Sequence, residues 1–179
     1  GLLTMALAGF AKDFIAGAVL NDVGPEIAAS GGARILEYIG KDVRFNSLED
    51  AVVAQKAAST AYPDLSEEDW MQQTANNFKF DAEAGNYKLN YDLNIAKALA
   101  EQLNTSEPVD LWPFFAKLND IPTLAIRGGL SDVLSAEVFE RMKAENPTME
   151  TLVLENRGHV PLLNEPEVLE KMDQFIARI

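Results

Sequence analysis

The stretches Thr123-Leu-Ala-Ile-Arg-Gly-Gly-Leu-Ser-Asp132 and Thr151-Leu-Val-Leu-Glu-Asn-Arg-Gly-His159 share one pattern. Each is a short apolar run that leads into a glycine-containing turn, and a helical pattern follows each turn, which predicts strand, loop and helix twice. The turns present Asp132 and His159. Ligands of open α/β sheets bind beyond the carboxyl ends of the strands. Asp132 and His159 are therefore candidates for the acid and the base of a nucleophilic triad, in which the acid orients the imidazole.

Composition restricts the kinds of partner. The chain has 179 residues, enough for one compact domain, and its net charge of −13 argues against a nucleic-acid-binding face and against binding to an anionic membrane surface. Cysteine is absent and there is a single histidine, which excludes disulfides, thiolate metal sites and His-rich metal sites. We expect no metal, no nucleic-acid partner and no membrane partner. The sequence leaves the oligomeric state open.

Targeting signals are not evident in the sequence. No apolar run approaches the roughly 20 residues that cross a bilayer. The apolar start, residues 1–9, is short and has no basic flank, so a secretory signal is the wrong interpretation. We expect a cytoplasmic protein.

Apolar runs at both ends of the chain predict one sheet with helices. Residues 2–10 have almost no polar face, which predicts a helix buried on all sides. The continuous run from Ile15 to Asp22 predicts a strand buried on both faces, ended by Gly24-Pro25. Further strands are expected at 122–126 and 151–154. Helices are expected at 112–118, at 135–145 and from Glu165-Pro166 onward.

The stretch from residue 30 to residue 103 has a different character. Helices are expected at 33–39, after the capping residues Ser47 and Ser66, and at 94–103, whereas residues 79–92 fit either a small hairpin or an irregular loop. No buried, continuous strand pattern occurs in this stretch. We therefore expect a core made of residues 1–29 and 104–179, with residues 30–103 inserted as a helical cap.

The order of these motifs resembles the α/β-hydrolase fold over essentially all of the chain. The order is Asp22-Val-Gly-Pro25, the inserted helices, Arg127-Gly-Gly-Leu-Ser-Asp132, Gly158-His159, Asn164-Glu-Pro-Glu167 and a terminal helix. The resemblance implies an α/β fold: the C-terminal three parallel strands of the family's sheet with flanking helices, and a helical cap inserted after the first of these strands.

The resemblance also implies a reaction. The family's triad runs Ser, then Asp or Glu, then His, and Asp132 and His159 match the second and third members. Gly1-Leu2-Leu3 is similar to the residues just after the family's Gly-x-Ser-x-Gly turn, so the serine is expected upstream of Gly1, and no serine of this sequence fits that turn. The implied activity is hydrolysis of an ester, lactone or carbon–carbon bond of a small apolar substrate, without a cofactor.

Each candidate has an alternative interpretation. Asp132 could be a turn residue and helix cap, and His159 a surface histidine. Asp22 competes for the role of the acid, because some relatives with this fold take it from that strand end, although Asp-Val-Gly-Pro favours a turn. Val133 and Val160 are candidate substrate contacts, or else ordinary packing residues.

Two alternatives concern the whole chain. It could be a catalytically incomplete fragment, with a sheet edge left without its partner strand. It could also be a ligand-binding protein without hydrolytic activity on the same fold.

Overall fold

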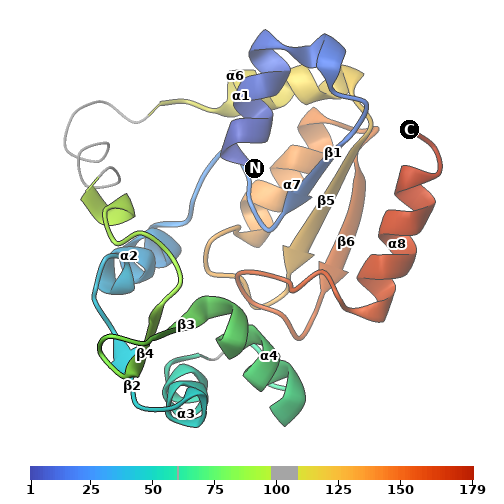
Figure 1. Cartoon of the computed structure of the whole chain (residues 1–179). Helices are drawn as coiled ribbons and strands as arrows, with labels where there is room; N and C mark the ends of the chain where they lie inside the picture. The colour runs from blue at the N-terminus through green and yellow to red at the C-terminus, as the bar shows by residue number, and fades with distance from the viewer. Residues whose placement is uncertain (60, 98–108) are drawn as a thin grey trace. The chain divides into compact units, whose positions relative to one another are not determined.

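The computed structural model describes residues 1–59, 61–97 and 109–179. The chain forms two compact units, one of residues 1–32 with 109–179 (unit 1) and one of residues 33–108 (unit 2) (Figure 1). The core and cap were expected to divide at residues 30 and 104 instead. A role for unit 2 as a cap stays a prediction. Within the described ranges, no helix combines the length and the apolarity that crossing a bilayer requires.

The sheet of unit 1 has three parallel strands in the order β1-β5-β6. Their bounds are Ala18–Asn21 for β1, Thr123–Gly128 for β5 and Glu150–Leu154 for β6. The central strand, β5, is buried along nearly its whole length, as expected where helices cover both faces of a parallel sheet. The predicted α/β fold class is confirmed. Strand β1 begins at Ala18, later than the predicted start at Ile15, and a 3-10 helix, η1 (Lys12–Phe14), precedes it.

Helices lie on both faces of this sheet (Figure 1). One face packs against α1 (Leu2–Phe10), α6 (Trp112–Phe115) and α7 (Ala136–Glu145), together with the 3-10 helix η2 (Ala116–Asp120). The other face packs against α8 (Pro166–Ile176). Side chains alternate between the two cores along a strand: Ala125 faces the first core, whereas Leu124 and Ile126 face the second.

Helix α1 is not buried on all sides, so that prediction is wrong. Met5 and Ala8 are buried, whereas Leu3 and Phe10 are 79% and 83% exposed. The reason is that α1 packs mainly on α6 and η2 on one side of the sheet, so a single stripe of an apolar helix finds partners.

Unit 2 contains helices and a small antiparallel sheet. The helices are α3 (Leu48–Ala58) and α4 (Glu67–Asn77), and α2 (Ala29–Tyr38) runs into this unit. The sheet has the order β2-β4-β3, with β2 at Arg44–Phe45, β3 at Phe78–Asp81 and β4 at Asn86–Leu89. The hairpin interpretation of residues 79–92 is confirmed, whereas strand β2 was not predicted.

The capping residues predicted from the sequence mark where α3 and α4 begin. The hydroxyl oxygens of Ser47 and Ser66 accept hydrogen bonds from the backbone N–H groups of Asp50 and Asp69, each at 3.1 Å, so both serines cap their helices as expected. The helix expected at 94–103 lies largely outside the described residues.

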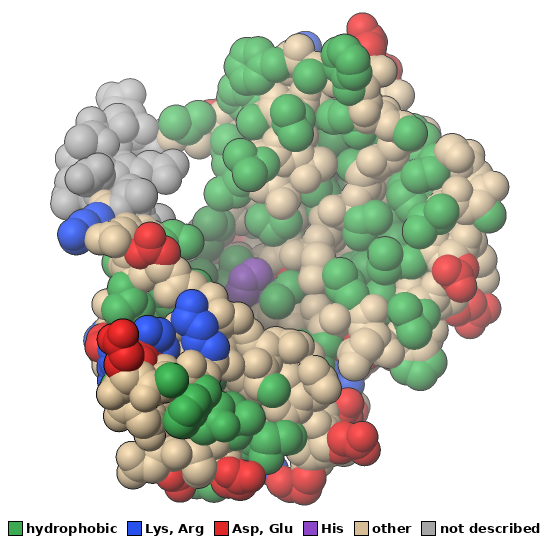
Figure 2. Space-filling model, viewed as in Figure 1, with side chains coloured by type: hydrophobic (Ala, Val, Ile, Leu, Met, Phe, Trp, Pro, Cys, Tyr) green, Lys and Arg blue, Asp and Glu red, His purple; other side chains and the backbone are tan. Residues whose placement is uncertain are grey.

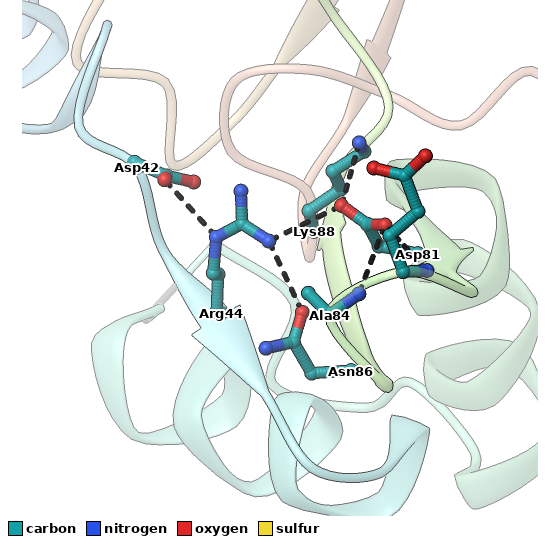
Figure 3. Close-up of polar contacts among 7 residues, drawn as sticks. Asp42, Arg44, Asp81, Ala84, Asn86 and Lys88 are labelled. Carbon is teal, nitrogen blue, oxygen red and sulfur yellow. Dashed lines mark hydrogen bonds and ion pairs between the residues drawn. The ribbon is translucent and has the colours of Figure 1, made fainter.

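A polar network joins the three strands of the small sheet (Figure 3). The guanidinium of Arg44 on β2 donates to Asp42 at 3.0 Å, to Asp81 at 3.3 Å and to Asn86 at 3.2 Å. Lys88 on β4 donates to the same carboxylate oxygen of Asp81 at 2.7 Å. The hydrogen bond from Lys88, with those from the Ala84 backbone and Arg44, holds the pKa of Asp81 well below its ordinary value.

Candidate active site

The two site residues follow the ends of the outer strands of the parallel sheet. Asp22 comes directly after β1, and His159 lies in the loop between β6 and α8. Since the strands are parallel, their carboxyl ends meet at one edge of the sheet. There, His159 Nδ1 lies 2.8 Å from Asp22 Oδ2. The carboxylate is fully buried, whereas the ring is 25% exposed and is visible as the one purple side chain in Figure 2.

Asp22 is held by donors from the central strand and its turn. Its Oδ1 accepts a hydrogen bond from the Gly128 backbone N–H at 2.8 Å, and its Oδ2 accepts one from the Ser131 hydroxyl at 2.6 Å. The Asp22 backbone N–H donates to the Ile126 carbonyl at 2.7 Å. Burial of a carboxylate costs free energy unless hydrogen bonds replace water. These donors supply that replacement and fix both oxygens in space.

The backbone of Asp22 is also specialised. Its φ of +53° lies in the left-handed region, which Asp adopts more readily than most residues. Directly after a strand, this conformation turns the chain out of the sheet. The turn that the Asp-Val-Gly-Pro motif suggested is therefore present, and the same residue supplies the carboxylate at the histidine.

The carboxylate at His159 Nδ1 belongs to Asp22 rather than to the expected Asp132, and which aspartate acts as the acid of the triad stays a prediction. The turn after β5 directs Ser131, one residue earlier, toward Asp22. The Asp132 carbonyl faces the start of α2, where it accepts from Ser30 Oγ at 3.3 Å and lies 2.4 Å from the position of a Cβ at Gly31. Ser131 of this turn therefore contacts the carboxylate that lies at His159 Nδ1.

Close backbone packing brings the histidine loop to the sheet. A Cβ at Gly128 would lie 2.5 Å from the Arg157 carbonyl oxygen and 2.6 Å from that of Gly158, so only glycine fits there without a shift. The Leu130 N–H donates to the Arg157 carbonyl at 2.9 Å. These backbone contacts hold the loop that carries His159 close to the strand end whose Gly128 N–H binds Asp22.

The partner at Nδ1 determines what the ring can do. A carboxylate only accepts, so Nδ1 carries the proton of the neutral ring and Nε2 is left as the acceptor. An imidazole oriented in this way can take a proton from a nucleophile and return it to a leaving group. Among the described residues, no serine hydroxyl is hydrogen-bonded to His159, which has Asp22 as its partner.

The two candidate substrate contacts differ in burial. Val133 is 2% exposed, and its Cγ2 lies 2.7 Å from the position of a Cβ at Gly31, which favours the packing alternative. Val160 is half-buried beside His159, and its contact with substrate stays a prediction. In the described part of the chain, no group of His, Cys, Asp and Glu side chains has the arrangement of a metal site.

Sequence reasoning considered Asp22 but missed the role of Ser131. The available signal was positional, since Asp22 and His159 both follow the end of a strand of the parallel sheet. Nothing in the sequence shows that a serine inside a turn would reach across to a neighbouring strand. The hydrogen bond from the Gly128 backbone N–H to Asp22 could not be predicted from the sequence either, because every residue except proline carries such an N–H.

Comparisons with known proteins give relatives over nearly the whole chain. No family model matches. The 3-hydroxybutyrate-oligomer hydrolase of Cupriavidus necator is 30% identical over 183 residues, which cover 99% of this chain and 62% of that protein. The crystal structure of an α/β-hydrolase from Novosphingobium aromaticivorans is similar with a TM-score of 0.91 and 35% identity, over 99% of this chain and 62% of that one.

A more distant structure supports the same architecture. An esterase from Mycobacterium tuberculosis is similar with a TM-score of 0.65 and 19% identity, over 100% of this chain and 58% of that one, and at this identity the likeness concerns the fold alone. The chain thus spans about 62% of the length of the relatives from Cupriavidus and Novosphingobium.

Proposed function

The chain has an α/β-hydrolase fold over the part of its relatives that it spans, and on that premise we propose that the protein is a hydrolase in which His159 is the general base. Asp22 orients the imidazole and stabilises its charged form. The observation that carries this proposal is the 2.8 Å contact between His159 Nδ1 and a fully buried carboxylate at the carboxyl edge of a parallel sheet.

The proposed reaction uses a serine triad. A serine hydroxyl gives its proton to His159 Nε2 and attacks the substrate carbonyl, and the imidazolium then protonates the leaving group. We propose that this serine lies in the portion of the relatives that the chain does not span, in a Gly-x-Ser-x-Gly turn. Backbone N–H groups near that turn would stabilise the oxyanion.

The proposed substrate is an ester of a small hydroxy acid. The relative from Cupriavidus necator is named for the hydrolysis of 3-hydroxybutyrate oligomers, which are esters of this kind.

Three variants of the full-length polypeptide test the proposal. We expect His159→Ala and Asp22→Asn each to lower kcat for p-nitrophenyl butyrate and for a 3-hydroxybutyrate dimer by about 10⁴-fold, since each removes a member of the triad. Asp132→Asn is the matched control and should change kcat only a few-fold. Steady-state kinetics measure all three.

The opposite pattern would show that the acid is Asp132. Unchanged rates in His159→Ala would rule out the proposed base altogether. Binding of the dimer without turnover by the unmodified protein would favour the ligand-binding alternative.

A further inference from the structure

The loop that carries His159 is closed by an ion pair. Arg157, two residues before the histidine, donates through Nε to Glu165 Oε1 at 2.8 Å. Both side chains are largely buried, at 14% exposed for Arg157 and 5% for Glu165. Hydrogen bonds between ionised groups are shorter and stronger than neutral ones, and this pair joins the two ends of the segment 157–165.

Glu165 is itself fixed to the sheet. Its Oε1 also accepts from the Leu162 backbone N–H at 3.1 Å, and its carbonyl accepts from the N–H groups of Val168 and Leu169 at 3.0 Å each, at the start of α8. Val168 is fully buried against β5 and β6 in the second core. A carboxylate is also favoured at a helix N-terminus. Glu165 is therefore a rigid point to which Arg157 is tied.

A second tether comes from the residue next to the acid. Asn21 Nδ2 donates to the Pro161 carbonyl at 3.0 Å, so the neighbouring residues Asn21 and Asp22 hold the backbone and the ring of the same loop. This contact holds the middle of the loop, and the ion pair holds its two ends.

We infer that Arg157 and Glu165 are positioning residues, which keep the His159 ring in line with Asp22. The inference rests on the proposed function. A catalytic ring has to be held within about half an ångström of its working position, and a loop reaches that precision only through packing and hydrogen bonds around it. Glu165 Oε2 has no hydrogen-bond partner among the described residues, so Oε1 accepts the hydrogen bonds from both the Arg157 side chain and the Leu162 backbone N–H.

Nuclear magnetic resonance of the single histidine tests the inference directly. The ¹⁵N shifts of the ring nitrogens report the tautomer, and the 179-residue chain has one histidine, so no assignment is needed. We expect one fixed Nδ1–H tautomer in the unmodified chain. In Glu165→Gln the shifts should move toward the average of both tautomers, and the Nδ1 proton should exchange with solvent at least about tenfold faster.

Two further variants make the result specific. Glu167→Gln, two residues along in the exposed first turn of α8, is the matched control and should leave the ring signals unchanged. Arg157→Lys keeps the charge but not the planar donor geometry, so it should show a smaller change in the same direction. Thermal melting confirms that each variant is folded, and Arg157→Lys carries the test if Glu165→Gln does not fold.

The outcomes separate this inference from the proposed function. Ring signals that change in Asp22→Asn but stay fixed in both Glu165→Gln and Arg157→Lys would overturn the positioning role and leave the proposed triad intact. Signals unaffected by Asp22→Asn would overturn the Asp22–His159 pair itself. A uniform loss of melting temperature with unchanged ring signals would show that the ion pair is only structural.

Discussion

Ser131 makes three of the hydrogen bonds that hold the site together. Its hydroxyl donates to Asp22 Oδ2 at 2.6 Å and accepts from the backbone N–H groups of Val133 at 3.2 Å and Leu134 at 3.1 Å. One side chain thus joins the acid on the end of β1 to the turn after β5. At the scale of residues, the site depends as much on such connecting side chains as on the proposed catalytic pair.

Replacement of Ser131 by alanine should be costly. The change removes one donor from a buried carboxylate and leaves two backbone N–H groups without their acceptor, so we expect the free energy of unfolding to fall by about 1–3 kcal/mol. Urea denaturation measures this loss. Ser30→Ala is the control, because the exposed Ser30 hydroxyl donates to the Asp132 carbonyl at the surface, and we expect a change under about 0.5 kcal/mol. Equal losses in the two variants would contradict the connecting role.

The small sheet of unit 2 shows what determines structure at the scale of elements. Strand β2 has two residues, too few for backbone pairing alone to hold it on β4. Arg44 on this strand reaches Asp81 and Asn86 on the hairpin, and Phe45 packs edge-on against Phe78 with ring centroids 5.4 Å apart. Side-chain contacts therefore hold β2 in the small sheet, although no local sequence pattern predicts a strand there.

The acid dependence of unit 2 should follow Asp81. Its pKa is lowered in the folded state, so its contribution to stability is present above the unfolded value of about 3.9 and is lost as the pH falls below it. We expect Asp81→Asn to be less stable than the unmodified chain at pH 7, with a smaller difference as the pH falls toward 3 and below. Fluorescence of Trp70, in a Trp112→Phe background, reports unfolding of this unit.

The control for this prediction is Glu68→Gln, which changes an exposed carboxylate in the first turn of α4 in the same unit. Its effect on stability at pH 7 should be much smaller than that of Asp81→Asn. A stability difference between Asp81→Asn and the unmodified chain that persists undiminished at low pH would contradict the assignment.

At the scale of the whole molecule, α1 exposes an apolar stripe. Leu3, Leu7 and Phe10 are 79%, 53% and 83% exposed, and their spacing of four and three residues places them on one face of the helix. Extended apolar patches on a surface mark contacts with other protein surfaces. In the same unit, β1 is an edge strand of the described sheet.

We expect the 179-residue chain to self-associate through this stripe. In Leu3→Gln/Phe10→Gln, association measured by sedimentation velocity over a range of concentrations should weaken, since less apolar surface leaves water. Leu169→Gln is the control, because Leu169 on α8 is 50% exposed but lies outside the stripe. Association that is unchanged in the double variant, or absent in the unmodified chain, would refute this prediction.

Most of the fold could be predicted from local pattern. Caps at Ser47 and Ser66, the Pro166 start of α8 and the buried run of β5 are signals that lie within a few residues of what they determine. Turn chemistry, capping and periodicity act over one or two turns of chain, so the sequence displays them directly. The histidine after the last strand was also predicted from such a pattern.

Only the tertiary structure decided which carboxylate contacts His159. Asp22 and Asp132 each follow a strand, and both satisfy the same local pattern. The choice depends on the parallel pairing of β1 with β5, which sets Asn21 beside Ile126, and on a turn that directs Ser131 to Asp22. Both depend on contacts between segments more than a hundred residues apart. Periodicity carries no information about such contacts, because packing and backbone hydrogen bonds form only once the sheet is assembled.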